Sequence, residues 1–192
     1  APKADTATGQ AGHFEGIIAR QYPRVHRVLN GLLGPEEADD AAQEVFLRLY
    51  RHPVVEQPEE RIAAWLYRVA VNTAYNLLRS RRRRAAHLQR AGQLALSDEP
   101  LQQASLNPAQ AVAAAEEAAL VRAALDALSE THRTVLVLRQ AGLSYAEVAA
   151  AAGVKPNSVG TLLTRAEAHL RDHYHRLAAA RPPHPPSPRS HP

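Results

Sequence analysis

The sequence contains no cysteine. That absence excludes disulfide bonds, thiolate catalysis and cysteine-ligated zinc within the chain. Aromatic side chains are also scarce, since one tryptophan, six tyrosines and two phenylalanines are the whole supply. No apolar run approaches the ~20 residues that a transmembrane helix needs, and the N-terminal APKADTATGQ has no apolar core. We therefore expect a cytoplasmic protein without membrane insertion.

Acidic residues are missing from residues 61–90, a segment that holds eight arginines. Within it, WLYRVAVNTAYNLLRSRRRR (65–84) has apolar residues at intervals of three and four, the pattern of an amphipathic helix. A solvated surface helix usually mixes both signs of charge, and this one does not. The segment indicates a nucleic-acid contact, with a merely basic surface as the alternative.

The preceding segment carries the opposite charge, because residues 35–60 hold eight acids against two arginines. An acidic helix suits a basic protein surface, whereas the arginine segment suits phosphates, so we expect two different partners. The sequence predicts a helix from about Glu36 to Arg51. Its predicted buried face consists of Ala42, Val45, Phe46, Leu49 and Tyr50.

Helical periodicity extends over nearly the whole chain and β-branched alternation is absent, so we predict an all-α fold. In the first helix, from about His13 to Leu33, Pro23 predicts a kink or a break. The two prolines of residues 52–60 predict a loop. The predicted organisation is two small helical domains, a flexible linker and a disordered proline-rich tail, at residues 10–84, 109–178, 85–108 and 179–192 respectively.

A helix-turn-helix is predicted within SYAEVAAAAGVKPNSVGTLLTRAEAHL (144–170). Ser144 and Glu147 form a capping box that starts a short helix, and Gly153 stands where the sharp turn needs a positive φ. Pro156 fits the first turn of the second helix. A plain helical hairpin is the alternative. The outward face of the second helix, a candidate for the DNA major groove, carries Asn157, Ser158, Thr161, Thr164, Arg165 and Ala168.

Taken in order, these segments resemble the bacterial extracytoplasmic-function (ECF, group IV) sigma factors of RNA polymerase. The likeness rests on DDAAQEVFLRLY (39–50), the 65–84 helix, a linker and LSETHRTVLVLRQAGLSYAEVAAAAGVKPNSVGTLLTRAEAHLR (128–171). It covers most of residues 13–175, and the ordered set is highly specific. It implies a sigma region 2-like bundle and a region 4-like helix-turn-helix bundle. The implied function is that of a dissociable polymerase subunit that reads the minus-thirty-five element as duplex and melts the minus-ten element.

The resemblance also implies which residues bind each partner. The implied contacts with the clamp helices of the polymerase β′ subunit are Asp39, Asp40, Gln43, Glu44 and Arg48. The alternative is that these residues only make the helix soluble. The implied minus-ten contacts are Arg61, Arg68, Asn72, Asn76, Arg79, Arg81 and Arg82, beside a loop from His52 to Arg61 that accepts an extruded base. The implied minus-thirty-five contacts are Lys155, Asn157, Ser158, Thr161, Thr164 and Arg165.

Two features of the chain shape these assignments. With so few aromatics, we expect polar recognition of base edges to outweigh stacking, and Tyr67 and Tyr75 to pack in the core or at its rim. The outward face of the second helix is weakly basic, so binding to an isolated duplex should be weak. Lys155 stands where a serine or threonine cap is usual, and Gly160 replaces a common basic residue, which leaves the promoter sequence open.

Other functions fit the sequence less well. No metal-protease, phosphate-loop or nucleophile motif is present, and His173 and His175 lie two apart on a helix, so we expect no enzyme and no cofactor or metal. A self-sufficient helix-turn-helix regulator is the main alternative, but it would leave the acidic helix and the Trp65 segment without roles. The resemblance implies further contacts with the β flap of the polymerase and with an anti-sigma factor.

Overall fold

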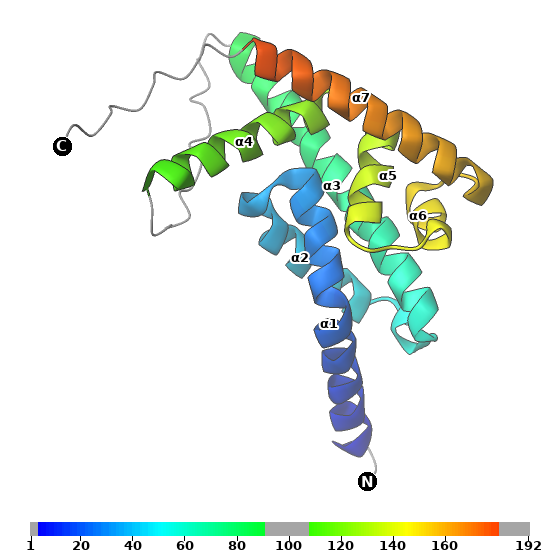
Figure 1. Cartoon of the computed structure of the whole chain (residues 1–192). Coiled ribbons are helices and arrows are strands. Elements are labelled where there is room, and N and C mark those ends of the chain that lie inside the picture. Colours follow the sequence, from blue (N-terminus) through cyan, green and yellow to red (C-terminus); the bar gives the residue numbers. More distant parts are fainter. Residues whose placement is uncertain (1–3, 91–107, 181–192) are drawn as a thin grey trace, which may run out of the picture.

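A computed structural model describes residues 4–90 and 108–180 (Figure 1). This part of the chain forms helices and short turns without any strand, which confirms the predicted all-α class. In chain order the elements are α1 (Ala4–Leu33), α2 (Pro35–Tyr50), the 3-10 turn η1 (Pro53–Glu56), α3 (Glu59–Arg90), α4 (Pro108–Asp126), α5 (Glu130–Gln140), α6 (Tyr145–Ala152), the 3-10 turn η2 (Pro156–Ser158) and α7 (Val159–Ala179).

Helices α1, α2 and α3 pack on one another as the first helical unit. Helix α1 begins at Ala4 rather than near His13 and continues through Pro23 to Leu33, so the chain does not break at the proline. The buried side chains of α1 recur at intervals of three and four, which turns one apolar face to α2 and α3. They include Ile17, Val25, Val28, Leu29 and Leu32.

A sharp turn at Gly34 joins α1 to α2. Its φ of +95° lies in the region that favours glycine, and Pro35 then starts the next helix without needing an amide donor. The predicted burial of Tyr50 is wrong, because its side chain is 62% exposed. The core face of α2 follows the row that ends at Leu49, and Tyr50 lies a further 100° round the helix, where its ring packs edge-on against Phe14.

Helix α3 is longer than the sequence predicted. Its buried row of Ile62, Leu66, Ala70 and Ala74 lies against α1 and α2. It continues to Arg90, so the first six residues assigned to the linker, 85–90, are helical. The rest of the predicted linker, up to residue 107, and the tail from residue 181 lie outside the described residues.

Helices α4 to α7 form the second unit, and the predicted helix-turn-helix is α6, the turn at Gly153 and α7. The capping box is present: the Ser144 amide donates to the Glu147 carboxylate at 2.7 Å, and the Glu147 amide donates to Ser144 Oγ at 3.3 Å. Gly153 has a φ of +69°, as the turn requires. Pro156 starts the 3-10 turn η2, which leads directly into α7.

The two units pack against each other as well as internally. Helices α5 and α6 lie on α1 and α3, and the buried side chains of both units join in one continuous cluster. Figure 1 shows α3 passing behind α5 and α6. Among the described helices, none is long and apolar enough to cross a membrane.

The turn glycine gives a test of this fold. A Cβ at residue 153 would meet no atom within 4 Å, so Gly153→Ala should destabilise the chain only through its left-handed backbone, by about 1–2 kcal/mol. Gly160 lies in the first turn of α7 with ordinary helical φ, and Gly160→Ala should stabilise the chain by about 0.5 kcal/mol. Urea denaturation of both variants measures the difference. A change of the same sign in both would contradict this account.

Candidate nucleic-acid interface

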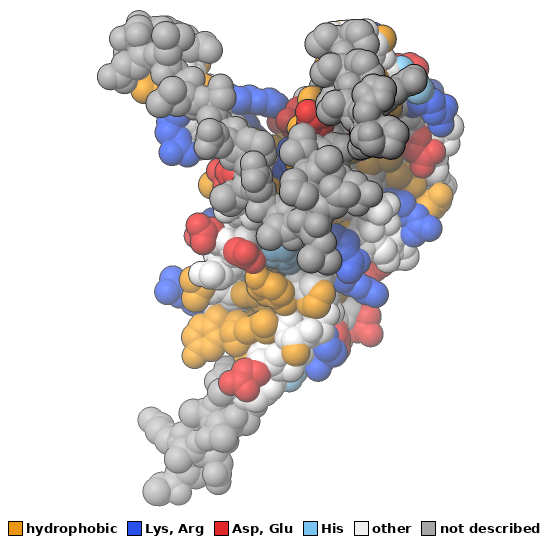
Figure 2. All heavy atoms as spheres, turned by 60° about the vertical axis from the view of Figure 1, so that its left-hand side comes forward, with side chains coloured by type: hydrophobic (Ala, Val, Ile, Leu, Met, Phe, Trp, Pro, Cys, Tyr) orange, Lys and Arg blue, Asp and Glu red, His pale blue; other side chains and the backbone are white. Residues whose placement is uncertain are grey.

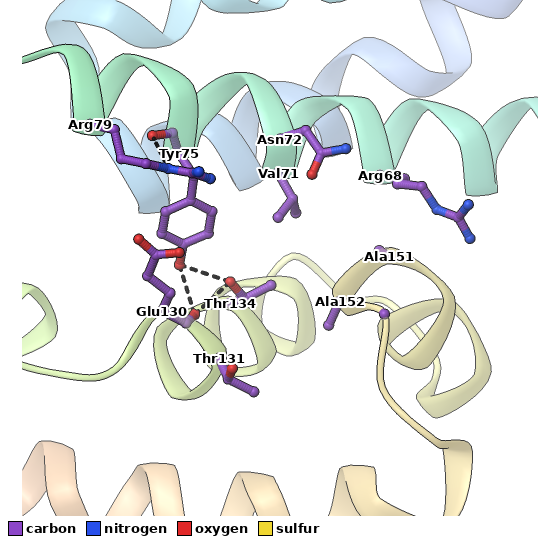
Figure 3. Close-up of a pocket in the computed structure, with 11 residues that line it drawn as sticks. Arg68, Val71, Asn72, Tyr75, Arg79, Glu130, Thr131, Thr134, Ala151 and Ala152 are labelled. Carbon is purple, nitrogen blue, oxygen red and sulfur yellow. Dashed lines mark hydrogen bonds between the residues drawn. The ribbon is translucent and has the colours of Figure 1, made fainter.

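A polar stripe runs along α3 on the side away from its core row. Arg68, Asn72 and Arg79 belong to it, at spacings that place them on one helical face, and Tyr75 lies between the last two. Figure 3 shows Tyr75 and Arg68 projecting from α3 toward α5 and α6, whereas Arg79 folds back along α3, where its Nε donates to the Tyr75 carbonyl at 3.2 Å. Three of the seven predicted minus-ten contacts therefore share one face.

The polar side chains of this stripe, Arg68, Asn72 and Arg79, are exposed, and only Tyr75 is buried. The stripe also lies beside the second unit. It forms one wall of a cleft of about 300 Å³ whose other wall belongs to the second unit. The residues of that opposite wall are Glu130, Thr131 and Thr134 of α5 and Ala151, Ala152 and Gly153 at the end of α6. The helix-turn-helix unit thus lies across a cleft from the face that the sequence assigned to minus-ten DNA, whose polar side chains stay exposed.

The remaining predicted minus-ten residues lie outside this cleft. Asn76 and Arg82 are exposed, and Arg61 donates a hydrogen bond to Gln57 at 3.1 Å. Arg81 forms an ion pair with Glu37 of α2 at 3.2 Å. The sequence offered no neutralising carboxylate within 61–90, but the packing of α2 on α3 supplies one.

An aromatic pair that the sequence analysis missed lies at the start of α3. The His52 ring packs on Trp65 with 4.8 Å between ring centroids, and His52 Nδ1 accepts a hydrogen bond from the Val54 amide at 3.1 Å. Residues 52–58 therefore form an ordered turn around η1 and not an open loop. The signal in the sequence was the histidine directly before Pro53, in a chain with few aromatic rings.

Three of the predicted polymerase contacts on α2 are engaged within the chain. Asp39 accepts a hydrogen bond from the Tyr22 hydroxyl at 2.9 Å and pairs with His26 at 3.1 Å. The Tyr22 bond to this carboxylate raises the pKa of the tyrosine. Arg48 pairs with Glu44 one turn away at 2.7 Å. All three residues stay on the exposed face of α2, where a partner could still reach them.

The same face of α2 carries large apolar side chains, and the sequence analysis did not predict that they are exposed. Leu47 is 58% exposed and, with Tyr50, follows the exposed Asp40 and Gln43 along the helix. Figure 2 shows a hydrophobic patch with charged side chains around it on the face turned forward from the α2 side of Figure 1. An apolar centre with a charged rim is typical of a protein-binding surface.

The outward face of α7 is open to solvent. Lys155, Asn157, Thr161, Thr164 and Arg165 are exposed, and Ser158 is half-buried. The Thr164 hydroxyl donates to the Gly160 carbonyl at 3.1 Å. None of these residues lines the cleft against α3. The predicted minus-thirty-five face therefore lies apart from this cleft.

Comparison with known proteins follows the same division of the chain. Residues 17–84 match the family model of sigma-70 region 2, and residues 118–170 match that of sigma-70 region 4. The sigma factor CnrH of Cupriavidus metallidurans is 31% identical over 177 residues, which cover 87% of this chain and 89% of CnrH. The chain belongs to the ECF sigma factors of RNA polymerase. Family membership makes it a transcription-initiation protein, and the region 2 match accounts for the part that a self-sufficient regulator would leave without a role.

Two other sigma factors extend this comparison. The sigma-H factor of Pseudomonas aeruginosa is 35% identical over 153 residues, covering 78% of this chain and 77% of that protein. SigE of Mycolicibacterium smegmatis is 31% identical over 163 residues, covering 83% of this chain, but the match spans only 61% of SigE.

Solved structures share the fold. The sigma factor RpoE, in complex with the anti-sigma factor NepR from Bartonella quintana, aligns with a TM-score of 0.58 at 21% identity, over 88% of this chain and 98% of RpoE. CnrH, in complex with the cytosolic domain of CnrY, aligns with a TM-score of 0.59 at 24% identity, over 93% of this chain and 96% of CnrH.

Arg165, an exposed arginine in the N-terminal half of α7, gives a test of the duplex-binding face. We expect Arg165→Ala to weaken binding of a random-sequence duplex and to lower the slope of log K against log salt by about 0.9, the value of one phosphate contact. Arg171→Ala is the matched control, because Arg171 lies further along α7 in the groove shared with Val121 and Tyr174. Fluorescence anisotropy over a salt series measures both. An equal loss in the two variants would contradict the assignment.

Proposed function

We propose that this ECF sigma factor acts as a dissociable subunit of RNA polymerase that reads the minus-thirty-five element through α7 and opens the minus-ten element through α3. The observation that carries the proposal is the arrangement of three surfaces on one chain. An acidic and apolar face lies on α2, a polar and basic stripe on α3, and a free helix-turn-helix face on α7. A cytoplasmic location follows from that role.

The face of α2 suits polymerase docking. Asp40, Gln43 and Glu44 supply polar and acidic groups, while Leu47 and Tyr50 supply exposed apolar area. Charge complementarity steers association and orients it, and buried apolar anchors provide most of the affinity. We infer that this face binds the β′ clamp helices.

Opening the minus-ten element exchanges one set of contacts for another. Breaking base stacking costs about 0.6–2.2 kcal/mol per step. Polar groups such as Asn72 and Asn76 can bind the edge of an extruded base, and exposed arginines such as Arg82 can bind the displaced strand. The His52–Trp65 pair lies beside the predicted base-accepting turn and adds an aromatic surface there.

Helix α7 is the element proposed to recognise the minus-thirty-five duplex. Asn157, Thr161 and Arg165 are exposed near its N-terminal end, where a recognition helix presents side chains to the major groove. Their weakly basic character means that the polymerase-bound α2 and α3 surfaces contribute the remaining affinity. The β flap is the proposed polymerase contact of the second unit.

An anti-sigma factor is the proposed inhibitor of this chain. Of the proteins that share its fold, RpoE was solved with the anti-sigma factor NepR and CnrH with the cytosolic domain of CnrY. The exposed acidic face of α2 and the open face of α7 are the surfaces that such a partner would have to cover.

Transcription from a promoter library tests the proposed function directly. Core polymerase mixed with the chain and with a library of promoter sequences should start RNA synthesis at a specific subset, because only the two units together recognise both elements. Sequencing of the transcript starts identifies that subset, and core polymerase alone is the control. Absence of chain-dependent starts anywhere in the library would refute the proposal.

A matched pair of leucines tests the docking surface in the same system. Leu47→Ser should weaken polymerase binding by roughly 1–2 kcal/mol, which is about five- to thirtyfold. Leu88 is also exposed but lies near the end of α3, so Leu88→Ser should leave binding unchanged.

The arginine run separates docking from DNA opening. Changing Arg79, Arg81 and Arg82 to Ala should reduce open-complex formation at least about tenfold, because contacts to the displaced strand are lost, while polymerase binding stays within about twofold. Changing Arg83 and Arg84 to Ala is the control. Permanganate footprinting measures opening and a binding titration measures docking. Equal losses in both measurements would contradict this division of labour.

A further inference from the structure

We propose that Tyr22 and His26 of α1 are positioning residues for polymerase binding, because they fix the direction of the Asp39 carboxylate on α2. The inference rests on the proposed function, since Asp39 lies on the exposed α2 face that we assign to the β′ clamp helices. It adds two side chains of α1 to a site that the sequence assigned to α2 alone.

Both side chains of α1 bind the same oxygen of Asp39. The Tyr22 hydroxyl donates to Oδ1 at 2.9 Å, and His26 Nε2 lies 3.1 Å from that oxygen. A carboxylate oxygen has two lone pairs, so Oδ1 accommodates both donors. Within the described part of the chain, no residue donates to Oδ2. The carboxylate is therefore held through one oxygen, and the other remains for a partner.

The Asp39 side chain stays accessible while it is held. It is 67% exposed, whereas the His26 side chain is 34% exposed and Tyr22 is half-buried. The two donors therefore contact the carboxylate from the more buried side. Because most of the Asp39 side chain still faces solvent, a partner can approach it without displacing either donor.

Aromatic stacking fixes the two donors in turn. The Tyr22 ring stacks on His26, with 5.7 Å between centroids, and on Phe46 of α2, with 5.8 Å between centroids. Phe46 is 5% exposed and belongs to the core. Helix α1 continues through Pro23, which keeps Tyr22 and His26 four residues apart on one helical face. The stack therefore connects the Asp39 carboxylate to the core of the first unit.

The other two acidic residues among the predicted polymerase contacts are not held by α1. Glu44 pairs with Arg48 of its own helix at 2.7 Å. The exposed Asp40 carboxylate has no ion pair or hydrogen bond with another residue in the part of the chain that the structure describes. Asp39 is thus held from a neighbouring helix, and Asp40 provides an adjacent carboxylate for comparison.

A carboxylate that is fixed before binding strengthens a complex. Ordering a free side chain opposes association, and a side chain already held in its bound direction avoids that loss of freedom. The effect of ordering one side chain corresponds to about two- to tenfold in affinity. Loss of the Tyr22 hydroxyl should therefore weaken polymerase binding although Asp39 itself is unchanged.

Tyr22→Phe removes the donor and keeps the ring that stacks on His26 and Phe46. We expect it to weaken binding of the full chain to core polymerase about three- to tenfold in a fluorescence titration. Its thermal unfolding should stay close to that of the parent, since such an exposed bond adds little to stability.

Tyr174→Phe is the matched control for this variant. The Tyr174 hydroxyl of α7 also donates to an exposed carboxylate, that of Glu117 in α4, at 2.7 Å. The control therefore loses the same kind of bond in the second unit, away from α2. It should leave polymerase binding within about twofold of the parent.

A double-mutant cycle separates positioning from a merely structural role. Asp39→Ala should weaken polymerase binding, and adding Tyr22→Phe should cause no further loss, because no carboxylate is left to hold. In an Asp40→Ala chain, Tyr22→Phe should still cause its full loss. His26→Phe keeps a ring for stacking but lacks the nitrogen, and it should behave like Tyr22→Phe in both backgrounds.

The ionisation of Tyr22 reports whether the bond forms in the free chain. The hydrogen bond to Asp39 raises the pKa of Tyr22 most, followed by partial burial and by the charge of that carboxylate. Asp39→Ala should therefore lower this pKa, which NMR of tyrosines labelled at Cζ measures. Tyr174 is the internal reference, because Glu117 raises its pKa in the same way and is unaffected by the change.

Any of four results would overturn the positioning role. Asp39→Ala could leave polymerase binding unchanged, Tyr22→Phe could bind as tightly as the parent or more tightly, its loss could be equally large in the Asp39→Ala chain, or the pKa of Tyr22 could stay the same in that chain. Tighter binding would mean that the bond competes with polymerase for Asp39. Initiation by the unchanged chain with core polymerase tests the proposed function separately, so a chain that initiates while Tyr22→Phe binds normally refutes only the positioning role.

Discussion

Helix α3 packs on the helices of both units at once, and the rest of the structure depends on this constraint. Its core row, with Leu66 and Ala70 at the centre, holds α1 and α2 together. About 160° round the helix, Tyr75 and Arg68 bind α5 and α6. A single long helix therefore forms part of the core of the first unit and also the surface against which the second unit packs.

The same constraint explains the distribution of charge. The acids of α2 and the arginines of α3 are separated in sequence but lie side by side in the fold, so Glu37 reaches Arg81. Exposed ion pairs of this kind add little to stability. Their effect is on function, because they set the number of cations that face a nucleic acid. Arg82 keeps an exposed side chain, whereas Arg68 hydrogen-bonds to the second unit.

Local features of the chain were predictable in detail. The capping box at Ser144, the positive φ of Gly153 and the order of acidic helix, basic helix and helix-turn-helix all follow from neighbouring residues and their spacing. Errors arose where a side chain lies on the border of a face. Tyr50 was assigned to the core although it is one position past the buried row. Of the kink or break predicted at Pro23, the break is absent, because packing on α2 and α3 maintains the helix.

The sequence by itself determined the helical class, the family and the types of residue on each candidate surface, because periodicity, caps and charge order are properties of short stretches of chain. Only the tertiary structure decided which of those residues are free. Tyr75 meets Glu130 across 55 residues, and Arg81 meets Glu37 across 44. No local pattern encodes such pairs, since they depend on how two separately folded faces fit together. That fit places the minus-ten stripe across a cleft from the helix-turn-helix unit and leaves the face of α7 open.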